Sequence, residues 1–138
     1  MAGGWPGGPV TERRRLSSGG PREESAGYSR ALVVGDTCHV SGTTDAGPDG
    51  RSTHPGDAGA QARASWAIVR RALEDGGFRL EDAVRTRMYV VRIEDAPAVS
   101  AVHGEIFGAI RPAATLVQVA GLMEPTLLVE VELEARRG

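Results

Sequence analysis

The segment LLVEVELEA, residues 127–135, constrains the fold more than any other, because apolar and acidic side chains alternate strictly along it from Val129 onward. Alternation with a period of two is typical of a β-strand that turns one face toward a core. Val131 and Leu133 then lie on the core face, while Glu130, Glu132 and Glu134 share the other. That acidic row is either a solvated strand face or a face on which one carboxylate does chemistry.

The spacing of apolar residues predicts further elements before this strand. They are a hairpin formed by 30–34 and 37–41, a helix over 58–75, a strand over 85–93, a helix from Asp95 to Gly108, and a strand over 114–122. Residues 42–56, rich in Gly, Pro, Asp, Ser and Thr, predict a surface loop. This order predicts an α+β fold, in which two helices cover one face of a mixed or antiparallel sheet.

The opposite face of such a sheet has no helix to cover it. Depending on register, it carries the row Tyr89/Val91 or the row Thr115/Val117/Val119, which include apolar side chains. A partly apolar face is unfavourable in water, so the pattern favours a homo-oligomer that covers it.

Composition excludes several classes of function. All 16 basic residues are arginine, so neither a Schiff-base lysine nor a phosphate-loop lysine is available. The net charge of −2 and the aromatic content of 4% disfavour a nucleic-acid partner, because such proteins usually combine a basic face with stacking aromatics. No apolar run approaches the roughly 18 residues of a membrane span, and no secretion signal is evident, so we expect a cytoplasmic protein without a membrane partner.

The remaining features predict a single domain without metal or redox chemistry. Residues 1–12 are rich in Gly and Pro and predict a flexible tail, which leaves 13–138 as the folded domain. Cys38 is the only cysteine and fits a small buried side chain better than a nucleophile. His39 and His54 lack the spacing of metal ligands, so no metal site is expected.

Three blocks in this order resemble the reactive-intermediate deaminases, the RidA or YjgF superfamily. They are AGYSRALVVGDTCHVSG (26–42), GDAGAQARASWAIVRRALEDGGFRLEDAVRTRMYV (56–90), and RPAATLVQVAGL followed by LLVEVELEA (111–135). The resemblance implies a chorismate-mutase-like fold, assembled as a homotrimer around a central barrel with clefts between subunits. In this family the clefts hydrolyse enamines and imines of small molecules, and no metal or organic cofactor is used.

The resemblance also implies candidate site residues. Tyr28 matches the family's cleft tyrosine, Ser41 and Gly42 match the Ser-Gly that ends the second hairpin strand, and Glu130 matches the acid that handles the catalytic water. Glu130 and Tyr28 are thus the catalytic candidates, and Glu132 and Glu134 are left as solvated-face residues. On the strand after Pro112, Thr115 and Leu116 are expected to contact the substrate, Leu116 in place of a smaller residue.

One departure affects the substrate. The amino-acid-directed deaminases carry, two residues after Pro112, an arginine that binds the substrate carboxylate, and this chain has Ala114 there. Losing a charged hydrogen-bond partner costs on the order of 1.5–3 kcal/mol, which is roughly 10- to 150-fold in affinity or rate. Arg111 is the main spare candidate for an anion contact, Arg87 a weaker one, and His103 a candidate at the cleft rim; each is alternatively an ordinary structural or surface residue.

Two functions follow from the sequence. The first is a cofactor-independent imine or enamine hydrolase that acts on a small metabolite other than the usual α-imino acids, in a dedicated pathway. The alternative is a non-catalytic trimer that binds a small molecule or a protein in the same clefts. An alanine at position 114 is compatible both with a loss of catalysis and with a change of substrate.

Overall fold

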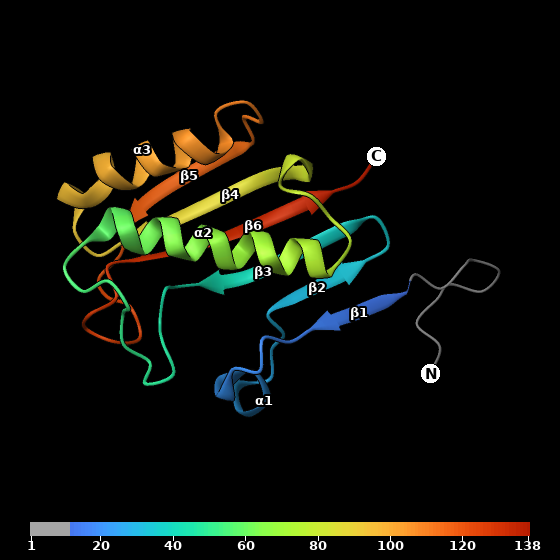
Figure 1. Ribbon diagram of the computed structural model, residues 1–138, viewed down its shortest axis with the longest axis horizontal. Coiled ribbons are helices and arrows are strands. Elements are labelled where there is room, and N and C mark those ends of the chain that lie inside the picture. The colour runs from blue at the N-terminus through green and yellow to red at the C-terminus, as the bar shows by residue number, and fades with distance from the viewer. Residues whose placement is uncertain (1–11) are drawn as a thin grey trace.

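The chain folds into a six-stranded mixed sheet with two long helices on one face, seen in front of the sheet in Figure 1. The structure is a computed structural model that describes residues 12–138. Its elements are β1 (Arg13–Leu16), α1 (Pro21–Ala26), β2 (Ala31–Val34), β3 (Thr37–Thr43), α2 (Ala58–Asp75), β4 (Ala83–Val90), α3 (Ala96–Phe107), β5 (Ala113–Gln118) and β6 (Val129–Arg136), with short 3-10 turns at Leu80–Asp82 and Ile93–Asp95. The predicted α+β class is confirmed, and the predicted tail lies, except for residue 12, outside the described residues.

Among residues 12–138 the strand order is β1-β2-β3-β6-β4-β5, and only the β4–β5 pair is parallel. The last strand in sequence therefore inserts into the middle of the sheet, between β3 and β4. Its predicted core face is confirmed, since Val129 and Val131 are 0% exposed and Leu133 is 1% exposed. Figure 1 shows both long helices on one side of the sheet. Because the apolar residues of β6 are buried under them, the alternating acidic row lies on the opposite face.

Helix α2 covers β3 and β6 with the stripe that its spacing predicts. Ala62, Trp66, Val69 and Leu73 are all buried in the core. The Asp57 side chain accepts a hydrogen bond from the Ala60 amide at 3.0 Å, which caps the helix, and Gly76 ends it. The second predicted helix is confirmed as α3, which has proline in its first turn and ends at Gly108.

Two strands are shorter at their C-terminal ends than predicted. β4 stops at Val90, because the chain turns into the 3-10 segment Ile93–Asp95 that leads into α3. Within the described part of the chain β5 pairs only with β4, so it stops at Gln118, opposite Val90, rather than continuing to Leu122. The register places Tyr89, Thr115 and Val117 on the face without long helices. The strand residues of both candidate rows, Tyr89 from the first and Thr115 and Val117 from the second, therefore lie on that face.

The sequence pattern missed β1 and α1. β1 pairs with β2 in antiparallel register, Arg13 opposite Val34 and Leu16 opposite Ala31. Short α1 follows, and its buried Glu23 accepts hydrogen bonds from the hydroxyls of Ser17 and Ser18. These contacts fix the segment that delivers Tyr28 to the sheet. Among residues 12–138, no helix combines the length and apolar character needed to cross a membrane.

The buried side chain of Gln61 in α2 binds the backbone of two loops, the loop after β3 and the segment before β6. Its Nε2 donates to the carbonyls of His54, at 3.1 Å, and Thr126, at 3.0 Å. Its Oε1 accepts from the Leu128 amide at 2.8 Å. The loop after β3 and the segment before β6 are therefore joined through one fully buried side chain.

We expect Gln61→Leu to lower the free energy of unfolding by about 2 kcal/mol or more, because three backbone groups lose their partner inside the protein. Denaturant unfolding measures this change. Arg70→Ala is the control on the exposed side of α2, where removing the ion pair with Glu74 should cost about 0.5 kcal/mol or less. Equal effects of the two substitutions would contradict the role assigned to Gln61.

Candidate functional site

Glu130 lies against the backbone of Gly42. A Cβ atom built on Gly42 would lie 2.1 Å from Glu130 Oε2, so only glycine leaves room for the carboxylate. The β3–β6 register shifts between Val40 and Thr43, which is a bulge at Ser41 and Gly42. Bulges of this kind are common next to active sites, because they redirect side chains and strand backbones. The sequence predicted these residues to share a site, and the fold brings them into contact.

The Glu130 carboxyl is partly removed from solvent, and this changes its acidity. Burial raises the pKa of Glu130, the positive charge of Arg30 lowers it, and the negative charge of Glu132 raises it, with a net rise. A carboxyl with a raised pKa binds a proton more readily than an exposed one. Glu130 thus has the character of a proton acceptor and donor.

The other two acids of the row are bound in a charge network. The Tyr89 hydroxyl donates to Glu132 at 2.5 Å, and Arg87 Nη1 lies 2.8 Å from Glu134 and 3.7 Å from Glu132. His39 Nδ1 lies 3.5 Å from Glu134. The prediction of a merely solvated face is therefore incomplete, because these partly exposed acids are paired across β3, β4 and β6.

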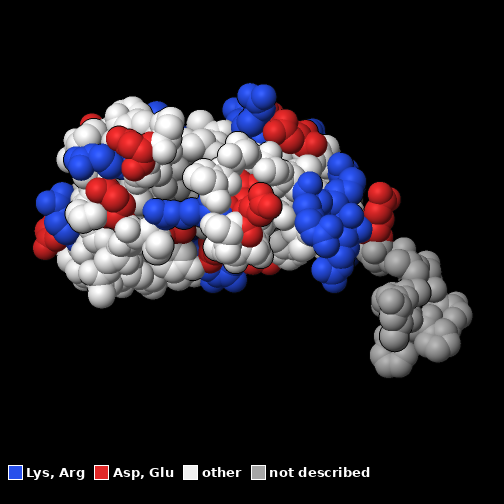
Figure 2. All heavy atoms as spheres, turned by 90° about the horizontal axis from the view of Figure 1, so that it is seen from below, with Lys and Arg blue, Asp and Glu red and all other residues white. Residues whose placement is uncertain are grey.

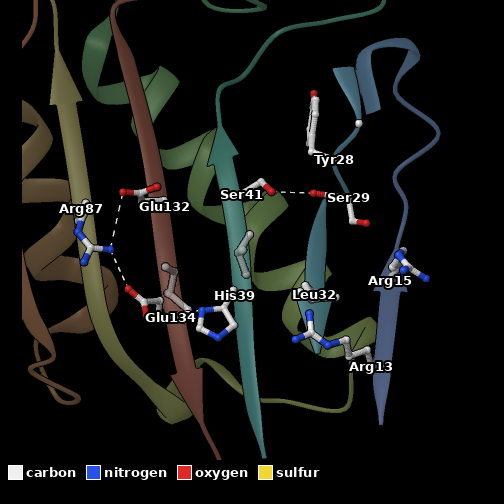
Figure 3. A pocket seen from close by; sticks show the side chains of 13 residues that line it. Arg13, Arg15, Tyr28, Ser29, Leu32, His39, Ser41, Arg87, Glu132 and Glu134 are labelled. Carbon is white, nitrogen blue, oxygen red and sulfur yellow. Dashed lines mark hydrogen bonds and ion pairs between the residues drawn. The ribbon is translucent and has the colours of Figure 1, made fainter. Parts of the chain in front are cut away.

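A groove of about 530 Å³ runs across this face from β1 to β4 (Figure 3). Its lining includes Arg13, Arg15, Tyr28, Ser41, Glu132 and Glu134. Glu130, two residues before Glu132 on β6, is not part of this lining. Arg13 and Arg15 stand at the β1 side, opposite Arg87 of β4 (Figure 3). Figure 2, which looks onto the β1 edge, shows how densely arginine side chains gather at that part of the surface.

Tyr28 and Ser41 are held at the groove by local structure. Gly27 ends α1 with a φ of 77°, and the Tyr28 amide donates to the Glu23 carbonyl at 2.8 Å, so the chain turns sharply before Tyr28. The Tyr28 side chain is left 42% exposed. The Ser41 hydroxyl donates to the Ser29 carbonyl at 2.6 Å, which ties the hairpin to the segment after Tyr28 (Figure 3).

The candidates on β5 do not reach Glu130 within one chain. Glu130 pairs with Tyr89, and Tyr89 with Val117, so β5 lies two strands away, at about 10 Å. Thr115 accepts a hydrogen bond from Arg85 Nη2 at 2.6 Å. Leu116 pairs with Met88 and packs against the core on the helix side. Exposed Ala114 lies on the outer strand of the sheet, where a neighbouring molecule can reach it.

Arg111 and His103 do not lie beside Glu130 or in the groove lining. Arg111 precedes β5, has a φ of 58° and is exposed. It stands six positions before Val117, a length of roughly 20 Å in an extended strand. His103 of α3 is hydrogen-bonded to Thr86 at 2.8 Å and packs with the rings of Trp66 and Phe107, on the helix side of the sheet. Burial lowers the pKa of His103. The fold thus gives His103 a structural environment and leaves its predicted role in a site untested.

Sequence reasoning overlooked Arg30, which contacts the site from the residue before β2. Its Nη2 donates to the Gly42 carbonyl at 2.5 Å. The available signal was the alternation of the hairpin, since Ala31 and Val33 are core residues and Arg30 must therefore share the opposite face with Leu32.

Cysteine and metal chemistry were not expected at this site. Cys38 is buried, as predicted, and burial raises its pKa to about 11, which keeps the thiol protonated. Within the part of the chain that the structure describes, no group of three or more His, Cys, Asp or Glu side chains is placed to hold a metal ion.

Comparison with known proteins identifies the family. The profile of the family described as Endoribonuclease L-PSP matches residues 21–137. An uncharacterized protein of Streptomyces coelicolor is 38% identical over 125 residues, which cover 91% of this chain and 92% of that protein. A RutC family protein of Pyrococcus abyssi is 30% identical over 108 residues, covering 78% and 83% of the two chains.

Solved structures agree with the sequence matches. Rv2704 of Mycobacterium tuberculosis, a member of the YjgF/YER057c/UK114 family, has a TM-score of 0.83 and 40% identity, covering 91% of this chain and all (100%) of that one. The YjgF protein of E. coli has a TM-score of 0.73 and 28% identity, covering 90% and 94%. The profile match, the fold and the sequence identity together show that this chain belongs to the Endoribonuclease L-PSP family, the RidA/YjgF/UK114 group.

Proposed function

We propose that the protein is a cofactor-independent hydrolase of small imines or enamines, with Glu130 as the group that moves the proton. The observation that carries this proposal is the partly buried Glu130 carboxyl, which lies against Gly42 beside a groove lined by Tyr28 and Ser41. The resemblance to the deaminase family supports the same chemistry. The substrate in this proposal is a metabolite without a free α-carboxylate, or one whose carboxylate is held differently from the family's usual way.

The chemistry demands little from the protein. A protonated imine is already electrophilic, so water adds to its carbon while Glu130 accepts one proton from that water. The product is a carbinolamine, whose nitrogen takes the proton back from Glu130. The ionised Glu130 then accepts the hydroxyl proton as the carbonyl group forms and ammonia leaves, and that proton departs with the ammonia as ammonium. Tyr28 and the backbone at Gly42 would orient the reacting atoms. Because Glu130 must be ionised to accept a proton, activity should rise with pH through its raised pKa.

The proposal includes a homotrimer with clefts between subunits. Strand β5 lies about 10 Å from Glu130 in the same chain, and the candidates Thr115 and Leu116 lie farther along it, so a compact site that uses both needs β5 from a neighbouring copy. Partly apolar side chains on the uncovered face, such as Tyr89 and 41%-exposed Val117, favour the same arrangement. The cytoplasmic location and the lack of nucleic-acid or membrane partners remain part of the proposal on the grounds of composition.

A non-catalytic binding protein is the second candidate, and Ala114 is the observation that favours it. Such a protein would use the same clefts to hold a small molecule or a protein partner. A ligand that raises the melting temperature without being converted would support binding alone. Endoribonuclease activity, which the family description names, is less compatible with the net charge of −2.

Glu130→Gln should reduce turnover of an accepted imine by about 100-fold or more, because the amide cannot accept the proton of the water. Ammonia release from imines generated in solution measures this loss. Glu105→Gln is the matched control, since it makes the same chemical change at an exposed ion pair of α3 with Arg63. Full activity of Glu130→Gln would contradict the proposed role of Glu130 in proton transfer.

Gly42→Ala should disrupt the site while leaving the fold intact. The new methyl group would occupy space 2.1 Å from Glu130 Oε2, so the carboxylate has to move away from the bulge. We expect a loss of turnover close to that of Glu130→Gln. Gly104→Ala is the control, because a Cβ there meets nothing within 4 Å. Unchanged turnover in Gly42→Ala would show that the position of the carboxylate does not matter.

Ala114→Arg should increase activity on 2-iminopropionate by roughly 10- to 150-fold, because it restores a charged partner for the substrate carboxylate. The unmodified protein should prefer neutral imines to 2-iminopropionate. Ala101→Arg controls for added charge, since it makes the same chemical change at an exposed position of α3. Efficient turnover of 2-iminopropionate by the unmodified protein would contradict the importance of position 114.

A further inference from the structure

Arg30 is held between two neighbouring strands. Its amide donates to the Leu16 carbonyl at 2.8 Å, and its carbonyl accepts from the Ser41 amide at 3.0 Å. Because the next residue, Ala31, is fully buried under the helices, strand alternation directs Arg30 to the face that carries Glu130. The backbone on both sides of this side chain is therefore fixed.

The guanidinium of Arg30 is unusual in how it is bound. Its Nη2 donates to the Gly42 carbonyl at 2.5 Å, while its Nε is enclosed and has no hydrogen-bond partner among residues 12–138. Across those same residues it forms no ion pair, whereas Arg87 contacts two carboxylates. The positive charge of a partly buried guanidinium that has no carboxylate partner is not neutralised, so it acts more strongly on other charges nearby.

Gly42 lies between this cation and Glu130. The Arg30 guanidinium donates to the carbonyl of Gly42, and the Glu130 carboxylate lies on the side of Gly42 where a Cβ would project, too close to leave room for one. One glycine residue thus separates the two charges, in a region where both are partly removed from solvent. Among residues 12–138 no hydrogen-bond donor contacts the Glu130 carboxylate, so the attraction to Arg30 is its main favourable interaction with a charged side chain.

We propose that Arg30 is a positioning residue that keeps the Glu130 carboxylate over Gly42 in its proton-accepting form. The inference rests on the role proposed above for Glu130, and it adds the residue that makes this role possible. It acts in two ways: the hydrogen bond to Gly42 fixes the bulge on which the carboxylate lies, and the positive charge favours the ionised acid.

The other charged and titratable groups near Glu130 either raise its pKa or are paired with other residues. From β6, the negative charge of Glu132 raises the pKa of Glu130, and burial does so more strongly. From β4, the Tyr89 hydroxyl is bound to Glu132, and Arg87 is paired with Glu132 and Glu134. From β3, His39 is paired with Glu134. Arg30 is the group that lowers the pKa of Glu130.

The test is a carbon-13 NMR titration of the full chain labelled at the side-chain carboxyl carbon of glutamate. Comparison with Glu130→Gln identifies the signal of Glu130. In Arg30→Gln the midpoint should move to higher pH, because removal of a nearby positive charge disfavours the ionised carboxyl. Arg30→Lys should give an intermediate midpoint, and Arg63→Gln, on the far side of α2, should give the unmodified one. An unchanged or lower midpoint in Arg30→Gln would overturn the inference.

A pH profile of kcat/KM adds a functional readout. The acid limb should move to higher pH in Arg30→Gln by the same amount as the NMR midpoint, with activity recovering at alkaline pH. A merely structural role would instead lower activity at every pH. If Arg30→Gln does not fold, as judged by circular dichroism, Arg30→Met provides a neutral variant that keeps the apolar stem, and the same outcomes apply.

The two readouts separate this inference from the proposed function. A shifted NMR midpoint in a protein that converts no imine would retain the electrostatic role of Arg30 and reject the hydrolase. Normal hydrolysis with an unshifted midpoint would retain the hydrolase and reject the role of Arg30.

Discussion

The alternation of β6 is the constraint on which the rest of the structure depends. This strand pairs on both sides, with β3 and β4, and its apolar face is sealed under α2. A slip of one residue would exchange the two faces and bury Glu130, Glu132 and Glu134 without partners. The register is therefore fixed by the core, and the acids are held on the uncovered face with little freedom to move along the sheet.

The same face shows how similar residues acquire different roles from their surroundings. Glu132 and Glu134 are paired with Tyr89 and Arg87, so their charges are satisfied within the sheet. Glu130 instead meets the backbone at the β3 bulge, where burial raises its pKa and Arg30 opposes that rise. The difference arises from one bulge and one glycine, because both remove the neighbours that a regular strand pair would supply.

The sequence predicted the central elements because their patterns are strong. The stripe of Trp66 and Val69 in α2 and the alternation of β6 are buried as expected. β1 was missed because three consecutive arginines hide its alternation, and its strand character comes from pairing with β2 rather than from its own composition. Part of the candidate site could be predicted from Tyr28, Gly42 and Glu130. Arg30 could not be assigned to it without the register, because its contact with Gly42 joins residues across a hairpin.

The buried amide of Gln61 has a consequence for motion around the site. It binds the carbonyl of His54 in one loop and the backbone of Thr126 and Leu128 in another. The Ser52 amide of the first loop also donates to the Thr126 hydroxyl of the second at 2.8 Å, so local unfolding of the two loops is thermodynamically coupled. We therefore expect the two loops beside the acidic strand to open together more readily than either opens alone.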